Sequence, residues 1–157
     1  MLNEYHIKFL HHFGKYDVAF LIIGGQARHF LDSSHQTNDL DIWVRLQPGD
    51  IMRLENALVA WANEHPQHAI SQRLVPPLRL RPDVQIKFPE IDGVWFLDLD
   101  ENSREQGTRD GIDVLTSLYD LDFDECMRRA GQFDARGVTV FSLCRSDLDR
   151  TPKASGP

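Results

Sequence analysis

Two aspartates separated by one leucine, Asp39 and Asp41, are the part of the chain best suited to chemistry. On a β-strand successive side chains point to opposite faces, so both carboxylates project from one face while Leu40 and Ile42 point into a core. Neighbouring carboxylates repel each other and lose hydration, and a fold rarely keeps such a pair at a strand start unless a cation lies between them. The spacing therefore predicts a site for a divalent cation.

A glycine pair, Gly24 and Gly25, closes an apolar strand before the aspartates and leads into a helix predicted to start at Gln26. Glycines let backbone N–H groups approach an anion at a helix N-terminus. Arg28, just inside this helix, is expected to reach a phosphate, the alternative being a solvated arginine. An anion site beside two carboxylates is what metal-dependent chemistry on a nucleotide phosphate requires.

Asp113 is the best candidate for a third carboxylate, because apolar residues flank it at strand spacing in the segment 111–116. A charged residue on an otherwise buried strand is costly unless something pairs with it. Asp39, Asp41 and Asp113 would meet if their strands are neighbours in one sheet. Magnesium prefers oxygen ligands and keeps several waters. A pair of such ions would activate a hydroxyl and stabilise a leaving pyrophosphate.

Each part of this pattern also has an ordinary explanation. Glycine pairs after strands are common in turns. Asp-x-Asp recurs in turns, caps and a polar tail, where solvated side chains are expected, at Asp98, Asp100, Asp120, Asp122, Asp124, Asp147 and Asp149. The combination of apolar strand, glycine pair, short helix, acidic strand and later apolar-flanked Asp113 is more specific than any single part.

Other polar residues give weaker signals. The seven histidines offer no tetrahedral zinc set with a cysteine or a further histidine. His29 and His35 lie close enough in sequence to contact a nucleotide, although surface positions are the more ordinary interpretation. Lys87 is a weaker phosphate candidate than Arg28. The tryptophans, Trp43, Trp61 and Trp95, are expected in the core.

Length and composition fit one domain over residues 1–150 with a flexible tail at 151–157. The formal net charge of -7 argues against tight or sequence-specific DNA binding, which depends on lysine and arginine neutralising phosphates. Cys126 and Cys144 have no metal-binding spacing and are expected to be reduced thiols. No apolar run reaches membrane-spanning length and no signal peptide is recognised, so a cytoplasmic protein without a membrane partner is expected.

Hydrophobic periodicity and turn residues predict the elements that position these groups. The predicted helices cover 2–13, 26–31, 50–63 and 122–130, with Asp50 and Asp122 as caps. The predicted strands cover 18–23, 39–46, 84–88, 94–99 and 111–118, followed by a hairpin over 133–143 that turns at Arg136-Gly137. Segments 65–82 and 101–110 are predicted to be irregular, and a polar tail is predicted from Asp147.

The chain resembles the nucleotidyltransferase superfamily that includes DNA polymerase β. That pattern is a hydrophobic strand, Gly-Gly or Gly-Ser, roughly a dozen residues, and then Asp, an apolar residue, Asp and another apolar residue. Segments 20–25 and 39–42 carry it here. Within the superfamily the chain resembles the AbiEii-like group, small bacterial proteins that include nucleotidyltransferase toxins. The second half carries the closer match, at 111–118, 121–125, 138–140 and 146–148.

The resemblance implies an α+β fold with a mixed sheet flanked by helices. It also implies Mg²⁺ or Mn²⁺ as cofactor, an NTP as substrate, and transfer of a nucleoside monophosphate to a hydroxyl. Asp39 and Asp41 match the metal-binding pair, and Asp113 matches a third carboxylate that can act as general base. Gly24 and Gly25 match the turn that contacts triphosphate. The acceptor stays open among tRNA, a protein and a small molecule, and a cognate toxin or antitoxin is a further expected partner.

The C-terminus departs from the family pattern. There, a lysine-containing helix is expected, but Pro152 precedes Lys153 and would break that helix. The role of Lys153 and a truncation of the chain therefore stay open. Two alternatives to the enzyme remain: a non-catalytic nucleotidyltransferase-like binding module, for example an antitoxin subunit, and a phosphohydrolase that uses the same acids.

Overall fold

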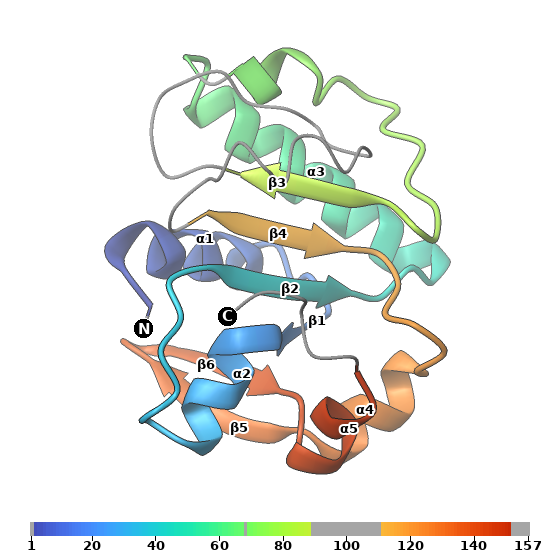
Figure 1. Ribbon diagram of the computed structural model, residues 1–157. Helices are drawn as coiled ribbons and strands as arrows, with labels where there is room; N and C mark the ends of the chain where they lie inside the picture. Colours follow the sequence, from blue (N-terminus) through green and yellow to red (C-terminus); the bar gives the residue numbers. More distant parts are fainter. Residues whose placement is uncertain (1, 68, 89–110, 152–157) are drawn as a thin grey trace.

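The computed structural model describes residues 2–67, 69–88 and 111–151, which form five α-helices and six strands (Figure 1). The helices are α1 (Glu4–Lys15), α2 (Gly24–Leu31), α3 (Pro48–Glu64), α4 (Phe123–Arg129) and α5 (Arg145–Asp149). The strands are β1 (Phe20–Ile23), β2 (Leu40–Val44), β3 (Gln85–Phe88), β4 (Ile112–Leu115), β5 (Gly131–Ala135) and β6 (Val138–Ser142). A short 3-10 helix covers Ala69–Gln72.

All six strands belong to one mixed sheet in the order β3-β4-β2-β1-β6-β5. The central strand pairs differ in direction: β1 runs antiparallel to β2, whereas β2 is parallel to β4 and β1 is parallel to β6. The outer strands β3 and β5 are each antiparallel to their neighbour. The predicted fold class, a mixed sheet flanked by helices, is therefore confirmed.

Helices α1 and α3 cover one face of the sheet (Figure 1). Phe9 of α1 contacts Trp61 of α3 and Phe88 of β3, with ring centroids 4.8 and 5.1 Å apart. His12 is also buried in this layer, and its Nε2 lies 2.7 Å from the Ala57 carbonyl oxygen. These contacts between α1 and α3 fix the main core against the apolar residues of the central strands.

Helices α2, α4 and α5 lie on the opposite face (Figure 1). Phe30 of α2 stacks on Phe133 of β5 with ring centroids 4.5 Å apart, and Trp43 of β2 meets Phe123 of α4 edge to face. Because side chains alternate along β2, Asp41 shares the face of Trp43. The acidic residues of the central strands therefore belong to the same side of the sheet as α2.

Local sequence signals explain the hairpin and the start of α4. Arg136 and Gly137 both have positive φ, 51° and 91°, as a two-residue type I′ turn requires. The Asp122 side chain accepts a 2.9 Å hydrogen bond from the Glu125 backbone N–H and caps α4. Both predictions are confirmed.

Three boundaries differ from the prediction. Helix α2 begins at Gly24 and not at Gln26, and its N-cap Ile23 offers no side-chain hydrogen bond as a signal. Helix α3 begins at Pro48, where the fixed φ of proline suits a first helical position. The polar tail predicted from Asp147 is wrong up to Asp149, because these residues form the end of α5.

Several predictions fall outside the described residues. These are the strand at 94–99, the loop at 101–110, the residues Trp95, Asp98, Asp100 and Lys153, and the tail beyond Thr151. In the described ranges, no α-helix has both the length and the hydropathy that crossing a membrane demands.

Candidate active site

Asp41 and Asp113 lie side by side in the centre of the sheet. Each is the second residue of its strand, and the parallel pairing of β2 with β4 makes them direct register partners. Register partners on adjacent strands project from the same face. Both residues are half-buried. Two carboxylates more than seventy positions apart in the chain are thus brought to one place, as predicted if their strands are neighbours.

Asp39 lies next to this pair but outside the ladder. It is exposed and precedes β2, whose first residue, Leu40, donates a 3.0 Å backbone hydrogen bond to the Gly111 carbonyl. Within the described parts of the chain, no three or more His, Cys, Asp or Glu side chains form a group that could hold a metal ion. The structure therefore brings Asp41 and Asp113 together and does not assemble all three predicted acids into one ligand set.

Gly24 brings the backbone at the start of α2 directly against the Asp41 carboxylate. Strand β1 ends at Ile23, which is the register partner of Asp41, so the next residue must turn beside that side chain. Gly24 has a φ of 64°, and a Cβ built there would overlap the Asp41 Oδ2 atom. At Gly25, a Cβ would overlap the Oγ1 atom of Thr37. Both glycines are therefore needed for close approach, and Thr37 is a contact that the sequence did not indicate.

The residues around this turn suit a magnesium ion in their chemistry. Carboxylate oxygens are preferred magnesium ligands, and Asp41 and Asp113 supply two such groups on adjacent strands. The Gly24 backbone borders the same carboxylate without a side chain in the way. Together these residues form the acidic notch: Asp39, Asp41, Asp113, Gly24 and Gly25.

A buried amide lies in the first turn of α2, next to the glycines. Gln26 is only 1% exposed, and its Nε2 atom has no hydrogen-bond partner among the described residues. A buried donor without an acceptor costs about 1–3 kcal/mol. A water, an ion or a functional role can each account for such a group. Sequence reasoning treated Gln26 only as a helix start.

We expect Gly24→Ala to destabilise the protein by about 2 kcal/mol, because the αL conformation and the overlap with Asp41 both oppose a side chain. Chemical denaturation measures this change in unfolding free energy. Gly14→Ala is the matched control: a Cβ at Gly14 meets nothing within 4 Å and the residue is inside α1, so this variant should gain up to about 1 kcal/mol. Equal stability of both variants would contradict the close approach at Gly24.

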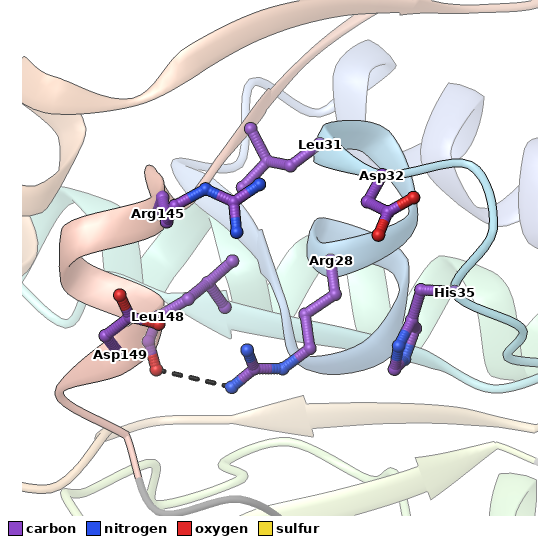
Figure 2. A pocket seen from close by; sticks show the side chains of 7 residues that line it. All are labelled: Arg28, Leu31, Asp32, His35, Arg145, Leu148 and Asp149. Atoms are coloured by element: carbon purple, nitrogen blue, oxygen red, sulfur yellow. Dashed lines mark hydrogen bonds between the residues drawn. The ribbon is translucent and has the colours of Figure 1, made fainter.

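Arg28 lies one turn further along α2 and faces a pocket between α2 and α5 (Figure 2). Its Nη2 atom donates a 3.3 Å hydrogen bond to the Leu148 carbonyl oxygen. The residue is half-buried, and its role in phosphate binding stays a prediction. Arg145 of α5 lines the same pocket and was not singled out from the sequence.

The histidines near the notch have different surroundings. His35 is exposed and lines the pocket, whereas the His29 Nδ1 atom lies 2.7 Å from the His35 carbonyl oxygen. Lys87 is the register partner of Asp113 on the other side, in β3. Its side chain lies outside the description, so its candidacy for phosphate binding stays a prediction.

A buried ion pair shows why the tail prediction failed. Asp147 is buried and its carboxylate accepts hydrogen bonds of 3.1 and 3.0 Å from Arg129 of α4. Burial raises the pKa of Asp147, but the bonds from Arg129 and Cys144 outweigh it and lower that pKa below its usual range.

Burial raises the pKa of the Cys126 thiol to about 11. Both cysteines are free, and Cys126 is held as a neutral thiol, which excludes it as a thiolate nucleophile.

Comparisons of the chain with models of protein families, with curated proteins and with solved structures find no match.

Proposed function

We propose that the chain is a magnesium-dependent nucleotidyltransferase that moves a nucleoside monophosphate from an NTP to a hydroxyl acceptor. The observation that carries the proposal is the register pairing of Asp41 with Asp113 beside the Gly24 turn. The segments 20–25 and 39–42, which resemble the superfamily pattern, end at this same notch. Two carboxylates can hold a cation, and the glycines at the start of α2 leave its backbone N–H groups open to an anion. This combination favours chemistry on a phosphate group.

Each residue of the acidic notch has a role in this proposal. Asp41 and Asp113 would hold magnesium, and Asp39, which the structure leaves outside this pair, is the third carboxylate of the proposal. When bound, the ion supplies a positive charge that stabilises the phosphate oxygens of the transition state. Asp113 also accepts the proton of the attacking hydroxyl. Gly24 and Gly25 let the first backbone N–H groups of α2 approach the phosphates and hold the NTP in line for attack.

The test is incubation of the full chain with each α-³²P-labelled NTP, Mg²⁺ and cell extract. We expect label to enter one class of acceptor, with one pyrophosphate released for each nucleotide transferred. Gel separation before and after nuclease or protease treatment identifies the acceptor as RNA or protein, and chromatography detects a small molecule. Release of orthophosphate without transfer would instead indicate a phosphohydrolase.

A second candidate function is a non-catalytic binding module with the same fold. One observation favours it: the described acids do not form a three-ligand metal site. Calorimetry with each NTP and Mg²⁺ discriminates between the two functions. The absence of any NTP binding together with tight association with a partner protein would favour the module, and binding of an NTP that strengthens with Mg²⁺ would favour the enzyme.

A further inference from the structure

The pocket between α2 and α5 is small and is lined by two arginines together with a histidine and two aspartates. It encloses about 130 Å³ and receives Arg28 from α2, Arg145 from α5 and His35 from the loop after α2. Figure 2 shows both arginine side chains extending into the space between the two helices. The two guanidinium groups thus reach one small space from two different helices.

The two arginines of the pocket differ from the paired arginines of the protein. Four described arginines form salt bridges with aspartates, namely Arg45, Arg53, Arg129 and Arg150. In the same described ranges, neither Arg28 nor Arg145 has a carboxylate oxygen within the 4.0 Å salt-bridge limit. Thus Arg28 and Arg145 have capacity to bind an anion from outside the chain.

Two carboxylates, Asp32 and Asp149, also line the pocket and offset part of its positive charge. The hydrogen bonds from Ser34, and to a smaller extent the charge of Arg145, lower the pKa of Asp32. Asp32 accepts hydrogen bonds of 3.0 and 2.7 Å from the backbone N–H and the hydroxyl of Ser34. Asp149 lies at the exposed end of α5. Both also oppose the approach of a long polyanion, which needs a continuous stripe of cations to neutralise successive phosphates. The pocket therefore suits a single terminal anionic group better than a chain of successive phosphates.

Phosphate is the anion that two guanidinium groups recognise best, because each presents a planar fork of N–H donors. The pocket, at about 130 Å³, has room for one such group. Arg28 lies four residues after Gly24 on one helix, a rise of roughly 6 Å. A polyphosphate bound at the acidic notch would need to extend about this far along α2 to reach Arg28.

We propose that the α2–α5 pocket binds the terminal phosphate of a polyphosphate through Arg28 and Arg145, with His35 as a further donor. This inference rests on the proposed function only in identifying the ligand as the triphosphate tail of an NTP. It assigns Arg145, from the last helix, to substrate binding. Helix α5 is then part of the proposed site.

The test is calorimetry of the full chain with tripolyphosphate in EDTA, so that neither metal nor catalysis contributes. We expect Arg145→Gln to weaken binding at least about tenfold, the effect of losing a hydrogen bond between charged partners. Arg128→Gln is the matched control: it makes the same charge change at an exposed site on α4 and should leave affinity unchanged. Asp149→Asn should strengthen binding a few-fold, a gain that misfolding cannot produce.

Three outcomes would overturn the inference. These are equal affinity of the Arg145→Gln and Arg128→Gln variants, no binding of tripolyphosphate by the wild type, and tighter binding of a short single-stranded RNA that lacks a terminal triphosphate. The last result would assign the pocket to a nucleic-acid backbone. Tripolyphosphate binding that depends on Arg145, without transfer from any NTP, would support the pocket and contradict only the proposed catalytic function.

Discussion

Replacing Asp41 by asparagine is expected to lower the rate of nucleotidyl transfer about a thousandfold. The change removes one charge from the acidic notch at the point where Asp41, Asp113 and Gly24 meet. Loss of a metal-binding carboxylate costs several kcal/mol of transition-state stabilisation, and about 4 kcal/mol corresponds to this factor. Incorporation of labelled NTP under single-turnover conditions measures the effect.

Three further variants test whether the loss of activity in Asp41→Asn comes from the acidic notch. Asp113→Asn should cost as much as Asp41→Asn, and the double variant should be little worse than either, because residues that act on one centre are not additive. Asp120→Asn makes the same chemical change in an exposed turn and should retain full activity. Thermal unfolding should stay cooperative in all variants. Activity within about twofold of the wild type in Asp41→Asn would contradict the catalytic assignment.

The centre of the site was accessible to sequence reasoning because its signals are local. The apolar residues around Asp113 predict a strand, and a charge on such a strand indicates a partner. The glycine pair before Asp39 marks a turn. What the sequence did not contain was the register: a shift of one residue between β2 and β4 would have moved Asp113 to the other face of the sheet. The observed pairing of Asp41 with Asp113 comes from the packing of both strands against the α1–α3 core.

The proposed phosphate pocket between α2 and α5 depends on long-range contacts that leave no local signal in the sequence. The segment after Cys144 is polar and precedes a proline, which is typical of a tail. It folds as α5 because Asp147 is buried against Arg129, 18 residues away in the chain, and because Arg28 bonds to the Leu148 carbonyl from α2. Arg145 reaches the pocket only through these contacts. For this reason, sequence reasoning singled out Arg28 as a candidate and did not single out Arg145.

At the start of α3, Asp50 also makes contacts that the local sequence does not indicate. Its position before an apolar helical repeat predicts a cap, but the helix starts two residues earlier, with Gln47 as the N-cap. The Asp50 side chain takes part in the capping box by accepting a 3.3 Å bond from the Gln47 backbone N–H. It also accepts bonds from Nε and Nη2 of Arg45, at 2.6 and 3.1 Å, and from Arg53 at 3.1 Å. Arg45 follows β2 directly, so this pair ties the acidic strand to α3. The position of the site thus depends on an ion pair outside it.

Asp50→Asn is expected to destabilise the protein by about 2–3 kcal/mol, because it leaves two arginines without a buried partner. The side chain of Asp50 is only 2% exposed, whereas that of Asp124, the other partner of Arg45, is 46% exposed. Asp124→Asn is therefore the control on the same arginine, and it should cost no more than about 1 kcal/mol. Urea denaturation at pH 7 measures both. Equal losses would contradict the dominance of the buried pair.

Lowering the pH should remove the contribution of Asp50 to the free energy of unfolding. The hydrogen bonds from Arg45 hold the pKa of Asp50 below its ordinary value of 3.8 in the folded protein. A carboxyl whose pKa is lower in the folded state binds fewer protons there, so its stabilisation is complete above the unfolded-state pKa and is lost as the pH falls through the folded-state pKa. The difference in unfolding free energy between wild type and Asp50→Asn should thus be constant above about pH 5 and shrink below about pH 4. A difference that grows on acidification would show that Asp50 is stabilised in its protonated form and would refute the ion pair.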